Sequence, residues 1–187
     1  MHRNQAGWGW IVKAVVYTLS SALAGLLTGA FLGAAGNLLP LDFRLAAGSI
    51  LAVIAIAVGG LEFFGRRVRL PQLDCETPQR WVHRGPLEWA TRNGLTLGFG
   101  ATSRIGFWLW YVIPLGAFLV GDPRLGAIIY GMYGLVRALG AVFIFLGMLL
   151  LEADISEWLI ERYGAARFLA AGQLVFLGVA LTIVVGL

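Results

Sequence analysis

Two arginines stand inside long apolar runs of this sequence, where a charged side chain needs a partner. Arg104 is about ten residues into the run at 95–120, and Arg137 is about thirteen residues into the run at 125–151. At the rise of an α-helix, each lies roughly 15 to 20 Å along its run, near the middle of a membrane. No Asp or Glu stands at a matching depth. An arginine there costs about 2.5 kcal/mol or more unless it faces a partner or a wet cavity.

These two arginines have several candidate partners. In one interpretation, Arg104 and Arg137 line a binding site for an anionic group, with the hydroxyls of Thr102 and Ser103 beside them. In another, they donate to helix carbonyls or extend toward the lipid headgroups. In a third, one of them pairs with a carboxylate of another subunit. The first interpretation makes these four residues the candidate substrate-binding set.

The segment around Arg104 also weakens a regular helix, because LGFGATSRIGFW contains Gly98, Gly100 and Gly106. Irregular backbone at membrane depth is tolerated only where protein or water covers it. We therefore expect this run to be broken or re-entrant near these glycines. Discontinuous helices mark substrate sites in many transporters, although glycine is also simply frequent in membrane helices.

Other chemistry finds little support in the sequence. Cys75 is the only cysteine, so neither an intramolecular disulfide nor a CxxC motif is present. His2 and His83 have no acidic or cysteine residues around them at metal-ligand spacing. Triads of Ser, His and Asp, phosphate-binding loops and paired intramembrane carboxylates are also missing. We therefore expect no enzymatic activity, no metal site and no other cofactor.

The elements that must position the arginines are membrane helices. The 187 residues are 59% hydrophobic and 13% charged, whereas a soluble domain carries about a quarter charged residues. This composition predicts one all-α domain, a polytopic bundle with about five spans. A short amphipathic helix on the membrane surface is expected over 154–163, with Gly164 as its stop. The spans are expected at about 14–36, 45–64, 95–120, 125–151 and 168–187.

A basic loop at 65–92 separates the second and third spans and contains six arginines. With the N-terminus inside, ten of the fourteen cations are cytoplasmic, as the positive-inside rule requires. This pattern predicts a prokaryotic cytoplasmic membrane and a cytoplasmic N-terminus. Anionic lipid headgroups are the expected partner of the cations, and nucleic acid is not. Trp81 and Trp89 are membrane-interface anchors or a surface that docks a partner protein.

Glycines recur every four residues in the first span, at Gly25, Gly29 and Gly33, and again at Gly94 and Gly98. Small residues at this spacing allow two helix backbones to approach closely. We expect both stripes to be packing surfaces between helices, and a sliding or gating surface is the functional alternative.

The order of features from about residue 20 to 140 resembles the membrane domain of the CcdA/DsbD-type thiol electron carriers. SALAGLLTGAFLGAAGNLLP looks like the first glycine-rich element of that family, and GLTLGFGATSRIGFWLWYVIP looks like the second. The resemblance implies a shared scaffold of six spans, one more than we count here. Electron carriage in the family needs a cysteine in each element, and neither segment contains one. A thiol redox relay is therefore excluded for this chain by itself.

Two functions from different classes follow. The first is a small transporter-like protein that binds or passes a small anionic solute near Arg104 and Arg137. The second is a noncatalytic subunit that stabilises or docks other components of a larger membrane complex. In either case we expect a homo-oligomer or an assembly with other membrane subunits.

Overall fold

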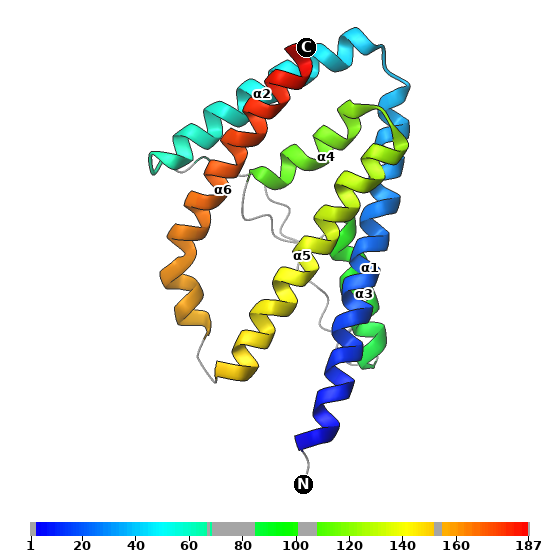
Figure 1. Ribbon diagram of the computed structural model, residues 1–187, viewed down its shortest axis with the longest axis vertical. Coiled ribbons are helices and arrows are strands. Elements are labelled where there is room, and N and C mark those ends of the chain that lie inside the picture. Colours follow the sequence, from blue (N-terminus) through cyan, green and yellow to red (C-terminus); the bar gives the residue numbers. More distant parts are fainter. Residues whose placement is uncertain (1–2, 67, 69–84, 101–107, 152–154, 187) are drawn as a thin grey trace.

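The computed structural model describes residues 3–66, 68, 85–100, 108–151 and 155–186. Within these ranges the chain folds as six helices without a strand, which confirms the all-α prediction. The helices, shown in Figure 1, are α1 (Arg3–Asn37), α2 (Leu41–Phe63), α3 (Pro86–Phe99), α4 (Leu109–Val120), α5 (Pro123–Leu151) and α6 (Ile155–Gly186).

Among the described residues, three helices are long and apolar enough to cross a membrane. They are α1 from Gly9 to Asn37, the whole of α2, and α5 from Pro123 to Ile144. Shorter apolar stretches occupy Trp110–Val120 in α4 and Arg167–Ile183 in α6. The chain is therefore an integral membrane protein built as a helical bundle.

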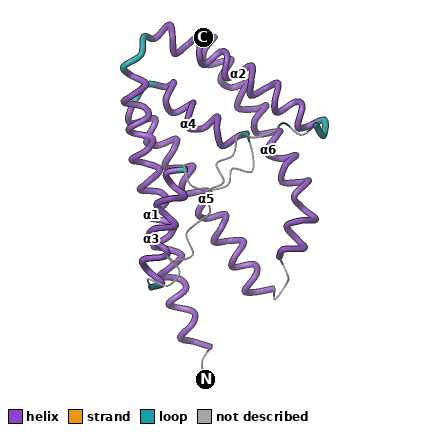
Figure 2. The backbone as a smooth tube through the Cα atoms, turned by 180° about the vertical axis from the view of Figure 1, so that it is seen from behind, coloured by secondary structure: helices purple, strands orange, loops and turns teal. Residues whose placement is uncertain are grey.

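The helices form two groups. α1 packs against α5 and α3, whereas α2 packs mainly against α6. α4 contacts helices of both groups and lies between them, as Figures 1 and 2 show from opposite sides. The N-terminus and the C-terminus lie at opposite ends of the molecule (Figure 1).

The first glycine stripe lies where α1 crosses α5. A methyl group added at Gly25 would come within 2.5 Å of the carbonyl oxygen of Tyr130, and one at Gly29 would overlap the carbonyl of Gly126. Higher numbers on α1 meet lower numbers on α5, so the two helices are antiparallel. Only glycine permits this approach, because any Cβ would displace the opposite backbone.

The second stripe brings α3 onto the other side of α1. A methyl group at Gly94 would meet the carbonyl of Tyr17, and one at Gly98 would meet the carbonyl of Ser21. Here the numbers rise together, so α3 runs parallel to α1. Both predicted stripes thus lie at backbone-to-backbone contacts of the same helix.

The second group is an antiparallel pair of helices, α2 and α6, with its own apolar core. Leu51 and Ala55 of α2, Val112 of α4 and Leu174 of α6 form a buried cluster. Gly59 supports the approach from α2, because a Cβ there would lie 2.8 Å from the Val175 side chain. α4 thereby joins the pair of α2 and α6 to the rest of the bundle.

A contact at one end of the bundle ties the start of α2 to the end of α4. Arg44 donates a hydrogen bond of 2.7 Å from Nη1 to the carbonyl oxygen of Val120. The next residue, Gly121, has a φ of 63° and ends α4 in the left-handed conformation. Asp122 then caps α5, because its Oδ1 accepts the backbone N–H groups of Arg124 and Leu125 at 2.7 and 2.9 Å.

The run at 95–120, expected to be broken or re-entrant, is divided between two helices. α3 ends at Phe99, where Gly100 adopts a φ of 72°, and α4 begins at Leu109. Each helix is too short to span a bilayer alone, since about 20 residues are needed. Residues 101–107 lie outside the described part of the chain.

The expected stop at Gly164 is wrong. α6 runs without interruption from Ile155 to Gly186 and so contains both the proposed surface helix and the last span. Gly164 is not among the glycines with a positive φ. A glycine inside a helix costs only about 1 kcal/mol, so without a left-handed cap it does not end one.

Candidate functional site

Of the four residues proposed to bind a solute, only Arg137 lies in the described part of the chain. Arg104, Thr102 and Ser103 fall within 101–107, outside it. Arg137 is on the apolar helix α5 and is partly buried. The candidate site is therefore built outward from this one arginine.

Arg137 is held by aromatic residues of two helices. Its Cζ lies 3.9 Å from the ring centroid of Trp110 on α4, a stacking distance at which the ring's electrons attract a guanidinium. Its Nη1 donates a 3.0 Å hydrogen bond to the hydroxyl of Tyr133, one turn earlier on α5. The Trp110 and Tyr133 rings meet edge to face at 6.2 Å, which fixes both partners of the cation.

Tyr130 extends this arrangement to the end of α3. Its side chain is almost fully buried, its ring centroid lies 5.0 Å from that of Tyr133, and its hydroxyl donates to the carbonyl oxygen of Phe99 at 3.3 Å. That carbonyl belongs to the last turn of α3, where the carbonyl groups have no hydrogen-bond donor within their own helix. Tyr130 also packs so closely on Gly100 that a Cβ there would overlap its hydroxyl oxygen.

Together, Tyr130, Tyr133, Arg137 and Trp110 form a continuous line from the last turn of α3 to the first turn of α4. We call these four residues the arginine–aromatic cluster. Its position beside the helix break was not evident from the sequence. One signal was available, because positions 130, 133 and 137 follow the spacing of a single helix face. The contact with Trp110 depends on how α4 docks, which the sequence does not reveal.

A buried hydroxyl fixes α5 next to the cluster. Ser21 on α1 is fully buried, and its Oγ donates to the carbonyl oxygen of Gly134 at 2.9 Å. A Cβ at Gly134 would lie 2.6 Å from the carbonyl oxygen of Ser21, so the two backbones are in close contact there. α1 thus supports the turn of α5 that precedes Arg137.

One polar group at the start of α4 lacks an acceptor. The indole Nε1 of Trp108, the residue before α4, is buried and has no hydrogen-bond partner among the described residues. A buried donor without an acceptor is uncommon in folded proteins. It adds a second polar group to the edge of the break.

The proposed docking tryptophans are also only partly described. Trp89 lies on α3 with 38% of its surface exposed, and Trp81 lies outside the described residues. Glu88 and Arg92, on either side of Trp89 in the sequence, form an ion pair of 2.8 Å. Groups of three or more His, Cys, Asp or Glu residues that could hold a metal ion do not occur within the described ranges.

No protein-family model, curated protein or solved structure matches this chain. The likeness to the CcdA/DsbD-type carriers therefore stays a prediction from sequence. The arginine–aromatic cluster and the helix break beside it form the candidate site.

Proposed function

We propose that this membrane protein binds a small anionic solute beside Arg137, at the break between α3 and α4, as part of a transport function. The observation that carries the proposal is the guanidinium of Arg137 stacked at 3.9 Å on Trp110 inside an apolar bundle. A guanidinium offers five N–H donors in one plane, a geometry that matches carboxylate or phosphate oxygens. Stacking on a ring orients that plane before a ligand arrives, which lowers the entropy cost of binding.

The helix break supports an anion rather than a cation. Trp110 belongs to the first turn of α4, so Arg137 lies next to the N-terminus of a helix that starts within the bundle. The N-terminal turn of a helix carries partial positive charge and unpaired N–H groups. Broken membrane helices in transporters place such N-termini against the anionic groups of substrates. The positive end of α4 and the cation of Arg137 therefore favour the same ligand charge.

The test uses the purified protein in nanodiscs and three probe anions, chloride, acetate and inorganic phosphate, at constant ionic strength. A ligand at a hundred times its Kd stabilises the native state by about 2.7 kcal/mol. We expect at least one anion to raise the unfolding temperature of the natural protein, and Arg137→Gln to abolish this rise. Arg124→Gln is the matched control, because Arg124 is an exposed cation on the same helix. If both variants respond to the anions like the natural protein, no anion is bound at Arg137.

A second candidate function is a noncatalytic subunit of a larger membrane complex, and the exposure of Trp89 favours it. Exposed tryptophan beside charged residues is typical of docking surfaces as well as of membrane interfaces. Extraction in mild detergent followed by mass spectrometry would show the partners, and Trp89→Ala should release them. A chain that purifies alone, with or without the substitution, contradicts this alternative.

A further inference from the structure

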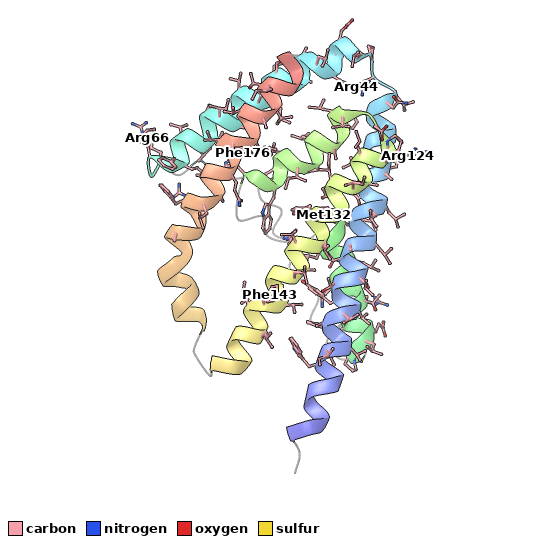
Figure 3. The ribbon with its side chains drawn as sticks, viewed as in Figure 1. Arg44, Arg66, Arg124, Met132, Phe143 and Phe176 are labelled. Carbon is pink, nitrogen blue, oxygen red and sulfur yellow. The ribbon has the colours of Figure 1, made fainter. Side chains whose placement is uncertain are left out.

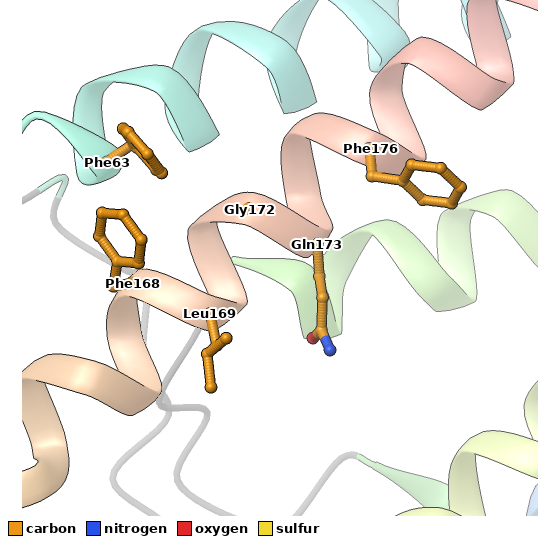
Figure 4. Close-up of a pocket in the computed structure, with 6 residues that line it drawn as sticks. All are labelled: Phe63, Phe168, Leu169, Gly172, Gln173 and Phe176. Carbon is orange, nitrogen blue, oxygen red and sulfur yellow. The ribbon is translucent and has the colours of Figure 1, made fainter.

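The antiparallel pair of α2 and α6 has an open apolar groove on its surface, with a volume of about 300 Å³. Figure 4 shows Phe63 of α2 facing Phe168 of α6 at one end of this groove, and their ring centroids are 4.2 Å apart. Gln173 contributes an amide to an otherwise apolar lining. The six lining residues are Phe63, Phe168, Leu169, Gly172, Gln173 and Phe176.

Cations lie near the end of the groove that Phe63 and Phe168 form. The apolar span of α2 ends at Phe63, and Arg167 is the last charged residue before the uncharged C-terminal part of the sequence. Arg167 donates a 2.7 Å hydrogen bond from Nη2 to the carbonyl oxygen of Arg66. Arg66 contributes only this backbone group, and its exposed side chain lies at the end of α2 in Figure 3. Arg66 and Arg167 are thus linked through the backbone carbonyl of Arg66 at the edge of the apolar surface.

One carboxylate lies near these cations. Glu62 is on the last turn of α2 and is 8% exposed. Among the described residues, it offsets part of the positive charge of the two arginines, but its carboxylate is buried whereas the side chain of Arg66 is exposed. An exposed Arg66, three residues after the groove residue Phe63, is thus complementary to a molecule with an anionic head and a hydrocarbon tail.

We propose that this groove binds one anionic phospholipid, with its phosphate at Arg66 and Arg167 and an acyl chain along the phenylalanine-lined face of α6. Charge complementarity selects the occupant. The groove alone fits any acyl chain, whereas the positive charges of Arg66 and Arg167 favour a lipid with net negative charge over a zwitterionic one. From Phe168 to Phe176 the helix rises roughly 12 Å, which accommodates a large part of an acyl chain that lies along it.

The first experiment is native mass spectrometry of the full chain in detergent, with phosphatidylglycerol or phosphatidylcholine of identical acyl chains added. We expect a discrete 1:1 adduct with phosphatidylglycerol and weaker binding of phosphatidylcholine. Arg66→Gln should lower phosphatidylglycerol binding about fivefold, the effect of one cation near an anionic headgroup. Arg66 is preferred to Arg167, because its side chain makes no hydrogen bond to another described residue. Arg124→Gln removes an exposed cation elsewhere and should leave the adduct unchanged.

A second variant tests the groove itself. A Cβ at Gly172 meets nothing within 4 Å, and Gly172 lines the groove, so Gly172→Leu should occupy the groove and displace the acyl chain. Gly140→Leu is the control, because Gly140 is equally open but lies on α5. Weaker binding of phosphatidylglycerol in Arg66→Gln and loss of the adduct in Gly172→Leu, with both controls unchanged, support the site. Equal binding of the two lipids, or an adduct insensitive to Gly172→Leu, shows only nonspecific boundary lipid and overturns the proposal.

Discussion

The side chain of Arg137 meets a tryptophan ring at 3.9 Å and a tyrosine hydroxyl at 3.0 Å. The two contacts use different properties of the guanidinium, the face of its plane and an N–H at its edge. An ammonium group has no such plane, so lysine cannot reproduce both contacts. The identity of this residue therefore matters beyond its charge.

Replacing Trp110 should show the value of the stacked ring. We expect Trp110→Leu to lower the free energy of unfolding by about 0.5–2 kcal/mol through the lost cation–π contact, in addition to lost packing. Trp110→Phe keeps an aromatic face and should lose less. Reversible unfolding in mixed micelles measures both values. Equal losses in the two variants would mean that the ring acts only as an apolar side chain.

Two glycine-to-alanine changes should affect the free energy of unfolding differently. Gly29→Ala forces a methyl group onto the carbonyl of Gly126, and overpacking of this kind costs about 1–3 kcal/mol. Gly140→Ala meets nothing within 4 Å, so the better helix propensity of alanine should leave it neutral or up to about 1 kcal/mol more stable. The same unfolding assay compares them. A neutral Gly29→Ala would contradict the close crossing of α1 and α5.

Some of these residues can be identified from the sequence and others cannot, for physical reasons. A charge in an apolar run is visible without a structure, because its desolvation cost does not depend on the fold. The two tyrosines share a helix face with Arg137, and their spacing was a signal that we did not use. Trp110 becomes a partner only through the docking of α4, and no local pattern encodes that contact.

At the scale of elements, the break between α3 and α4 follows from glycine. The glycine-rich segment predicted an interruption, and α3 ends at Phe99 because Gly100 turns the chain at a φ of 72°. The same type of residue gave a wrong prediction at Gly164, where α6 continues. Glycine permits a left-handed cap but does not impose one, so the surrounding packing decides which glycine ends a helix.

A double substitution tests how the break is fixed. Gly100→Ala should destabilise the protein by about 1–2 kcal/mol from the left-handed backbone alone, and more because its Cβ overlaps the hydroxyl of Tyr130. Tyr130→Phe removes that hydroxyl and its bond to Phe99. The double variant should therefore lose less stability than the sum of the single variants, by about 0.5–2 kcal/mol. Simple additivity would show that Tyr130 does not fix the end of α3.

In the whole molecule, the helices divide into the glycine-packed group of α1, α3 and α5 and the antiparallel pair of α2 and α6. α4 lies between the two groups. The composition predicted the membrane bundle, and the glycine stripes marked surfaces of close packing. The sequence did not reveal which helices pair, because lipid and protein interiors are equally apolar and hydrophobicity does not distinguish their faces. The glycine stripes and the polar face of Tyr130, Tyr133 and Arg137 are patterns that distinguish one helix face from another.

The expected orientation can be tested with the natural cysteine. Cys75 is the only cysteine, and the positive-inside rule places its basic loop in the cytoplasm. A membrane-impermeant maleimide should therefore label it in inverted vesicles and not in intact cells. Cys75→Ser combined with Arg124→Cys moves the thiol to the start of α5, which the same rule places outside, and should reverse the result. Labelling of Cys75 in intact cells would contradict a cytoplasmic N-terminus.

We have proposed that the chain binds a small anion at Arg137. The most direct test of this proposal is native mass spectrometry of the protein extracted from its own membranes in mild detergent, alongside Arg137→Gln and Arg124→Gln prepared in the same way. We predict a monomer or homo-oligomer that retains a small anion, and this anion should be absent only from Arg137→Gln. A stoichiometric set of other subunits without a bound anion would contradict the claim and favour a structural role in a complex.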